Sequence, residues 1–115
     1  LPQILADRRT NLVHSDLSAD NILIKDEDIH IIDFGSSAVM HPYWEFAHIV
    51  SASWRRDKFV NKLMNTEPMK EVFSDKKNLA VFKAFLVYIA AHRFAMHPYE
   101  TLENKIGFLK YTMNI

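Results

Sequence analysis

Residues 12–35 read Leu-Val-His-Ser-Asp-Leu-Ser-Ala-Asp-Asn-Ile-Leu-Ile-Lys-Asp-Glu-Asp-Ile-His-Ile-Ile-Asp-Phe-Gly. The apolar runs in this stretch are aliphatic, largely β-branched and too short for helices. Residues 12–13, 22–24 and 29–32 are therefore predicted to form three small strands. The charged segment 25–28 joins the last two strands, and its composition predicts a solvated hairpin turn.

Three oxygen-bearing side chains stand near the ends of these predicted strands. If the last two strands pair antiparallel, Asn21 and Asp33 lie at the same end of the hairpin, and Asp16 lies in the loop just before it. Mg²⁺ prefers oxygen ligands and is commonly held by one or two carboxylates together with substrate phosphates. The spacing therefore predicts a magnesium-phosphate site with Asp16 left for another role. The alternative is a set of turn and cap residues, because Asp and Asn favour loops.

The order His14-x-Asp16-Leu-x-x-x-Asn21, followed by Ile-Asp33-Phe-Gly35, resembles the catalytic loop and metal-binding turn of the protein-kinase-like superfamily. The amino-acid sequence of these motifs is most similar to that of the aminoglycoside phosphotransferase and choline kinase branch. This resemblance implies that Asp16 is the catalytic base or orients the substrate hydroxyl, and that Asn21 and Asp33 hold Mg²⁺ for ATP.

The resemblance also implies supporting roles around the loop. His14 would brace the loop backbone, and Gly35 would permit the tight turn after the metal aspartate. Glu45 stands where the family usually has an Asp that tethers the catalytic loop. Ser18 lies where kinases often place a phosphate-contacting side chain, and the alternative is a local hydrogen bond within the loop.

The distance from the metal aspartate to the next helix favours this branch over protein kinases. Pro42 follows Gly35 after six residues, which leaves no room for the long activation segment of a protein kinase. Three departures from the family pattern, at Ser15, at Ala19-Asp20 and at Ser36, bear on loop conformation. None of them removes an acid, a base or a metal ligand.

The composition is that of a globular protein. The chain has 115 residues, of which 49% are hydrophobic and 24% are charged, and its 14 basic residues balance its 14 acidic ones. A balanced charge argues against nucleic acid as the main partner. The absence of cysteine excludes disulfides and fits a reducing cytoplasm. With no spanning apolar segment recognised, the expectation is a cytoplasmic protein without a membrane partner.

The nucleotide-binding lobe of a kinase is not recognisable in the chain. The two glycines, Gly35 and Gly107, do not lie in a glycine-rich loop, and Leu1 begins on what reads as the last two turns of a helix. We expect the C-terminal lobe of a longer kinase, whose upstream lobe is its missing partner. The predicted fold class is α+β, with a catalytic loop and hairpin in residues 1–44 and a helical subdomain in residues 45–115.

Beyond residue 45 the apolar period changes to three or four, which predicts helices. The first is expected over residues 45–65, and Pro68 is expected to open a short second one. Residues 74–78 read as a polar loop or cap before a long apolar helix over residues 79–96. Pro98 should end that helix and occupy the first position of the last one. These helices are expected to pack as a bundle beneath the hairpin.

The leading functional interpretation is an ATP-dependent phosphotransferase that acts on a hydroxyl group of a small molecule. A non-catalytic kinase-like binding module is the main alternative, and a protein kinase is a weaker one. His41, His48, His92 and His97 form no i,i+4 pair, which argues against a zinc site. The following acids could attract a cationic acceptor or could simply be solvated: Glu67, Glu71, Asp75, Glu100 and Glu103.

Overall fold

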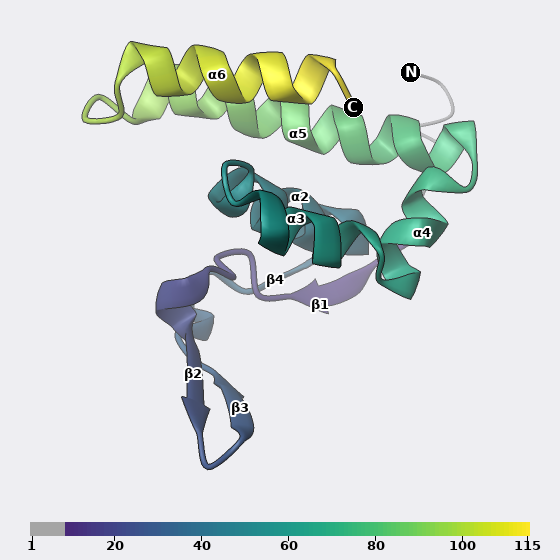
Figure 1. The fold of residues 1–115 in the computed structure, drawn as a ribbon, viewed down its shortest axis with the longest axis vertical. Helices are drawn as coiled ribbons and strands as arrows, with labels where there is room; N and C mark the ends of the chain where they lie inside the picture. Colours follow the sequence, from purple (N-terminus) through teal and green to yellow (C-terminus); the bar gives the residue numbers. More distant parts are fainter. Residues whose placement is uncertain (1–8) are drawn as a thin grey trace.

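A computed structural model describes residues 9–115, apart from the side chain of Ala19. The helix end expected over Leu1–Arg8 lies outside the described residues. Two pairs of short antiparallel strands are followed by a run of helices, which confirms the α+β class (Figure 1). The elements are β1 (Asn11–Val13), β2 (Ile22–Lys25), β3 (Asp28–Ile31), β4 (Ala38–Met40), α2 (Pro42–Ser53), α3 (Asp57–Met64), α4 (Glu67–Phe73), α5 (Lys76–Met96) and α6 (Leu102–Met113).

The hairpin of β2 and β3 has the predicted antiparallel register. Ile22 pairs with Ile31 and Lys25 pairs with Asp28. The two residues between the strands, Asp26 and Glu27, have φ of 51° and 67°. Positive φ at both central positions matches the right-handed strand twist that a two-residue hairpin needs. The turn expected over residues 25–28 is thus confirmed.

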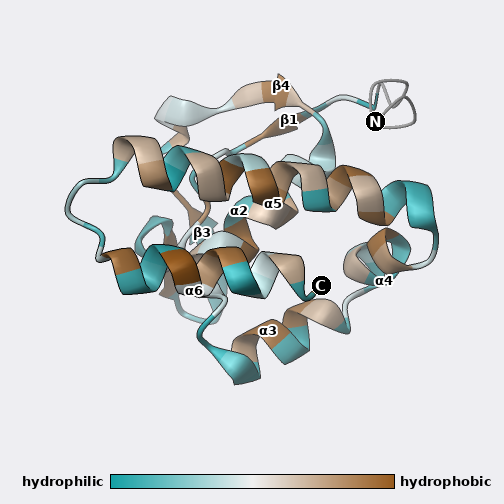
Figure 2. Cartoon of the chain, turned by 90° about the horizontal axis from the view of Figure 1, so that it is seen from above, coloured by the Kyte–Doolittle hydropathy of each residue, from teal (hydrophilic) through white to brown (hydrophobic). Residues whose placement is uncertain are grey.

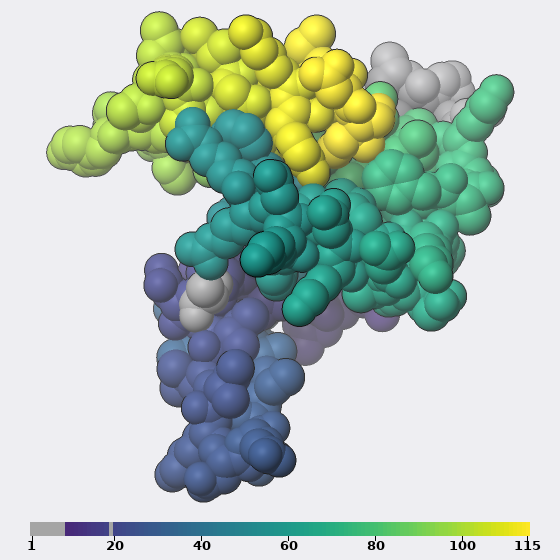
Figure 3. All heavy atoms as spheres, viewed as in Figure 1, coloured from purple at the N-terminus to yellow at the C-terminus, as the bar shows by residue number. Residues whose placement is uncertain are grey.

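The helices do not pack beneath this hairpin, which corrects the expected arrangement. Helix α2 contacts β1, and β1 pairs with β4, a three-residue strand that the apolar pattern did not reveal. The β2–β3 hairpin instead extends away from the helices (Figures 1 and 3). Its apolar side chains are therefore exposed: Leu23, Ile24, Ile29 and Ile31.

The single helix expected over residues 45–65 is two helices. Helix α2 ends at Ser53 and α3 begins at Asp57, with Arg56 in a non-helical conformation between them. The Trp54 ring, at the end of α2, packs against α6, where an ideal Cβ at Gly107 would lie 2.8 Å from Trp54 Cη2. The break in the segment expected as one helix is thus accompanied by close packing of the Trp54 ring against α6.

The starts of the later helices follow local capping rules. Pro68 lies in the first turn of α4, as predicted. Asp75 caps α5, where its Oδ1 accepts hydrogen bonds from the backbone N–H groups of Lys77 and Asn78. Pro98 does not open α6, which corrects that expectation. The helix begins at Leu102 because Thr101 Oγ1 accepts a hydrogen bond from Asn104 N and caps it.

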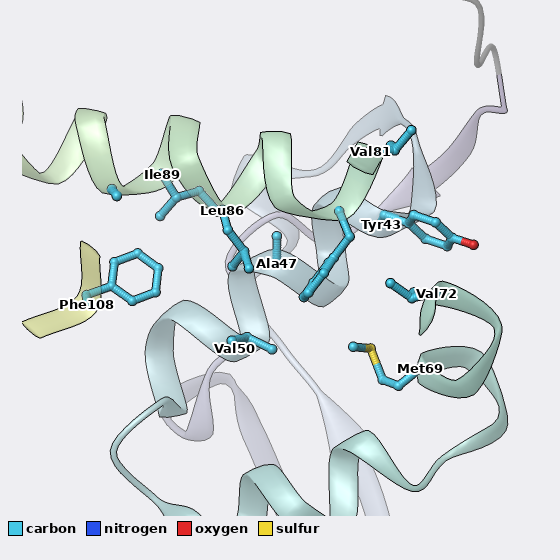
Figure 4. Packing of buried hydrophobic residues seen from close by; sticks show 11 residues of the cluster. Tyr43, Ala47, Val50, Met69, Val72, Val81, Leu86, Ile89 and Phe108 are labelled. Carbon is cyan, nitrogen blue, oxygen red and sulfur yellow. The ribbon is translucent and has the colours of Figure 1, made fainter. Parts of the chain in front are cut away.

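The hydrophobic core lies where α5 crosses α2 and is closed by α4 and α6. Leu86 of α5 lies beside Ala47 of α2, and Ile89 lies between Leu86 and Phe108 of α6 (Figure 4). Helices α5 and α6 run side by side, and their exposed faces carry mixed polar and apolar residues (Figure 2). This core fixes α2, whose first turns support the candidate site.

Helix α5 corrects the expectation that no segment could span a membrane. By length and composition alone, its 21 residues could do so, and 28% of the apolar window is buried within the protein. Its Phe82, Leu86 and Ala90 belong to the hydrophobic core. Length and hydropathy are therefore weak evidence for a membrane span here.

Candidate functional site

The loop between β1 and β2 brings Asp16 and Asn21 into direct contact. Asn21 Nδ2 donates hydrogen bonds to Asp16 O at 2.8 Å and to Asp16 Oδ2 at 3.3 Å. Asn21 is buried at the end of a single 3₁₀ turn, whereas the Asp16 side chain is exposed. The amide thus holds a carboxylate that faces solvent, and Asn21 Oδ1 takes part in neither bond.

His14 braces the same loop through both ring nitrogens. Nδ1 accepts a hydrogen bond from Asp16 N at 3.1 Å, and Nε2 lies 2.7 Å from Ile32 O. A carbonyl oxygen only accepts, so Nε2 carries the proton and the ring is neutral with this pairing. The imidazole is buried and has no nitrogen left for proton transfer. These contacts agree with the structural role that the family resemblance implies.

The antiparallel pairing of β2 and β3 places Asp33 near Asn21 along the hairpin. Ile32 N donates to Asn21 O at 2.9 Å, so residues 21 and 33 lie at the same end of the hairpin, as predicted. Asp33 has φ of 60° and ψ of 67°, a left-handed conformation that costs free energy for most residues. The next residue, Phe34, packs its ring 4.7 Å from that of His14.

Gly35 does not supply the backbone freedom expected of it. Its φ is not positive, and an ideal Cβ there would lie 3.4 Å from Asp33 Oδ1, which is an ordinary contact. The left-handed residues of this region are Ser15 and Asp33 instead. The tight turn is therefore made two residues earlier, at Asp33 itself, and glycine is not required for it.

Glu45 ties the loop to α2. Its Oε2 accepts a short hydrogen bond from His14 N, so the first turn of α2 holds the end of β1. A carboxylate in the first turn of a helix also interacts favourably with the helix dipole. Glu45 thus connects the loop after β1 to α2, at the position where the resemblance implies a tethering acid.

The donor set around Asn21 fits a hard cation. Carboxylate and amide oxygens are the ligands Mg²⁺ prefers, and few protein ligands suffice when substrate phosphates complete the shell. Asn21 Oδ1 and the exposed Asp33 carboxylate supply such oxygens from the same end of the hairpin. Within residues 9–115, no group of three or more His, Cys, Asp or Glu side chains could hold a metal by itself.

A cleft of about 730 Å³ opens beside the loop between β1 and β2, between α2 and α5. Asp16 and Ser18 form one wall of it. Ser18 contributes its backbone oxygen to the 3₁₀ turn, where it accepts from Asn21 N at 3.0 Å. The volume lies within the range of roughly 300–1,000 Å³ typical of small-molecule sites.

Sequence reasoning missed the histidines of this cleft. His48 on α2, His92 on α5 and His97 beyond it all line it, although no local spacing signals their proximity. The His92 and His97 rings lie 5.7 Å apart. Burial lowers the pKa of His48 below its usual 6.5, and nearby carboxylates only partly oppose that shift. The packing of α2 on α5 creates the cluster.

None of the acids considered for a cationic acceptor lines the cleft. Glu71 pairs with Arg9 at 3.1 Å, and Glu100 pairs with Arg93 at 3.3 Å. Asp75 is the cap of α5. The hypothesis that these side chains attract a cation to the cleft is therefore not supported by their positions.

Comparison with models of protein families assigns this chain to a family. The model of the phosphotransferase enzyme family matches residues 1–66, more than half of the 115 residues. The chain belongs to the phosphotransferase enzyme family. This places it in the protein-kinase-like superfamily, as its sequence resemblance indicated. Curated proteins and solved structures gave no significant match.

The family match covers only part of the candidate site. All the residues of the loop, the hairpin and the start of α2 lie within residues 1–66. The α5 wall of the cleft lies outside the match. The family match thus covers Asp16 and its supports, while the α5 surface that faces Asp16 across the cleft lies beyond the matched residues.

Proposed function

We propose that this chain is the C-terminal lobe region of an ATP-dependent phosphotransferase, similar to aminoglycoside phosphotransferases and choline kinases, that acts on a small-molecule hydroxyl. The observation that carries the proposal is the hydrogen-bonded pair of Asn21 and Asp16 at the mouth of the hairpin, beside a cleft. An upstream lobe of the longer protein would supply the remaining nucleotide contacts. The family match supports the reaction type.

Asp16 is proposed to act on the acceptor hydroxyl. The acceptor oxygen forms a bond to the γ-phosphorus of ATP while the bond from that phosphorus to the bridging oxygen breaks, releasing ADP. The hydroxyl proton passes to the Asp16 carboxylate, which Asn21 holds in place. In phosphoryl transfer, positioning and charge stabilisation supply most of the acceleration, so a fixed carboxylate at this place is what the reaction needs.

Asn21 and Asp33 are proposed to hold Mg²⁺, and Ser18 is proposed to contact a phosphate. When bound, the ion neutralises negative charge that develops on the β- and γ-phosphates. The backbone around both residues is already fixed, because the hairpin register places them at the same end of the hairpin and His14 joins the loop to Ile32. Little reorganisation of the protein would be needed when the nucleotide binds.

The test is Asp16→Asn in the full-length protein, which keeps the shape of the side chain and removes its basicity. We expect kcat to fall by about 10²–10⁴ with the affinity for Mg·ATP nearly unchanged. Asp28→Asn, at the far end of the hairpin, is the matched control and should keep full activity.

Two results would contradict the proposal. Full activity of Asp16→Asn would remove the assigned role of the carboxylate. Absence of any Mg·ATP-dependent thermal shift in the full-length protein would favour a non-catalytic module, because ligand at about 100 times its dissociation constant adds roughly 2.7 kcal/mol of stability.

A further inference from the structure

We propose that the acceptor bound in the α2–α5 cleft is an uncharged alcohol with a flat aromatic body. This inference rests on the proposed phosphotransferase function and names the substrate class of that site. It follows from the position of the cleft, from the rings that line it and from the charges it contains.

The cleft places a ligand next to Asp16. Asp16, Leu17 and Ser18 form its wall on the side of the catalytic loop, and α2 and α5 form the other sides. A molecule that fills this space can direct a hydroxyl group to the Asp16 carboxylate while its body lies against the helices. The body of the acceptor is therefore recognised by residues of α2 and α5.

Aromatic rings dominate the helical walls. The Trp44 ring meets that of Phe85 at 5.5 Å, edge to face, and that of Tyr88 at 5.7 Å. His92 stacks on Tyr88 with an interplanar angle of 24°. Tyr88 is 59% exposed although it belongs to this cluster, so much of its ring has no covering protein. Rings arranged in this way bind another flat ring by stacking and by edge-to-face contact.

The charges of the cleft do not suit a cationic acceptor. Asp16 is the sole carboxylate among the described lining residues, and the proposed reaction uses it for the hydroxyl. Arg93 also lines the cleft, but its guanidinium is paired with Glu100. A polycation would therefore meet one acid in the cleft, without the additional acids that its other charges need.

An anionic acceptor is not favoured either. Arg93 is already paired with Glu100 at 3.3 Å, both side chains are largely buried, and its other terminal nitrogen donates to Ser51 O at 3.1 Å. Its charge and donors are thus largely used within the protein. His48 adds no positive charge near neutral pH, because burial lowers its pKa. The imidazoles instead offer hydrogen bonds to neutral polar groups.

The experiment measures binding separately from turnover in the full-length protein. Naphthalenemethanol represents the uncharged aromatic alcohol, neomycin the polycation and choline the quaternary ammonium, each titrated by calorimetry and then tested for ATP consumption. We expect naphthalenemethanol to bind the most tightly of the three. Tyr88→Ala should weaken its binding roughly tenfold through the loss of ring contact.

Matched variants separate the cleft from the rest of the surface. Tyr99→Ala removes a tyrosine that is 99% exposed and lies outside the cleft, so naphthalenemethanol should bind it as it binds the unmodified protein. Ala52→Glu adds an acid at an exposed lining position of α2. This variant should bind neomycin several-fold more tightly than the unmodified protein does.

Each outcome decides a separate point. Tighter binding of neomycin or choline than of naphthalenemethanol, or unchanged binding in Tyr88→Ala, would overturn the inference even if the protein phosphorylates other alcohols. Tight, Tyr88-dependent binding of naphthalenemethanol without ATP consumption would support recognition of the aromatic alcohol and contradict the proposed phosphotransferase function.

Discussion

His14 Nε2 lies 2.7 Å from the carbonyl oxygen of Ile32, the residue that precedes the proposed metal ligand Asp33. The other ring nitrogen accepts a hydrogen bond from Asp16 N. A single buried imidazole therefore joins the loop that carries the proposed base to the hairpin end that carries the proposed metal ligand. This link holds the two parts of the site in one arrangement before any substrate binds.

Removal of this link should affect both stability and activity. We expect His14→Ala to lower the free energy of unfolding by about 1–3 kcal/mol, because Asp16 N and Ile32 O each lose a partner. Turnover should fall as well, since both parts of the site lose their common support. Urea unfolding and steady-state kinetics measure the two effects. His30→Ala, at an exposed position of β3, is the control, and equal losses in both variants would refute the bracing role.

Asp33→Asn should separate metal binding from folding. Asn tolerates the left-handed conformation, so stability should change by no more than about 0.5 kcal/mol, while affinity for Mg·ATP should fall at least about tenfold. Calorimetric titration with Mg·ATP gives the affinity. Asp26→Asn is the matched control, since Asp26 is also left-handed but lies in the hairpin turn. The same affinity in both variants would show that Asp33 is not a ligand.

His48 should make the protein less stable in mild acid. Burial lowers its folded-state pKa below 6.5, so its contribution is complete above that pH and is lost as the pH falls from about 6.5 toward the lowered pKa. Over that pH interval His48 is protonated to a greater extent in the unfolded chain than in the folded protein. Of the charged groups around it, Glu45 and Asp16 favour protonation, whereas His92 and Arg93 oppose it.

The comparison that isolates His48 is between the unmodified protein and His48→Gln, unfolded in urea between about pH 5 and about pH 8. The variant should show a smaller loss of stability on acidification. Parallel curves for the two proteins would assign the pH dependence to other groups.

Gly107→Ala tests close packing against helix propensity. Alanine favours a helix by about 1 kcal/mol relative to glycine, but its Cβ would lie 2.8 Å from Trp54 Cη2. We expect the clash to prevail and the variant to be destabilised by roughly 1–3 kcal/mol. Thermal unfolding measures the change. In the background Trp54→Leu, where the indole is absent, the same substitution should instead be neutral or stabilising.

Local patterns were sufficient for the hairpin and for the start of α4. Residues 22–24 and 29–32 are short apolar runs on either side of a charged, turn-forming segment, so neighbouring residues specify the hairpin and its register. The start of α4 was predictable for the same reason, because Pro68 acts within one helical turn. Helix α5 begins at Lys76, inside the segment expected as a polar loop or cap, because Asp75 caps it there. Each of these features depends on contacts only a few residues apart in the sequence.

Features that depend on distant contacts were predicted poorly. Strand β4 has three residues, too few for a pattern, and exists through its pairing with β1. The break between α2 and α3 goes with the contact of Trp54 with Gly107, about half the chain away. Pro98 was compatible with a helix start, but the cap at Thr101 determined where α6 begins.

The sequence by itself determined the order of Asp16, Asn21 and Asp33, the hairpin that aligns the last two and the family to which the chain belongs. These follow from short-range spacing, which a motif contains in full. Only the tertiary structure decided that α2 and α5 enclose a cleft at Asp16 and that its walls carry Trp44, Tyr88 and three histidines. Residues so far apart come together only when the core of the helices buries its apolar surface.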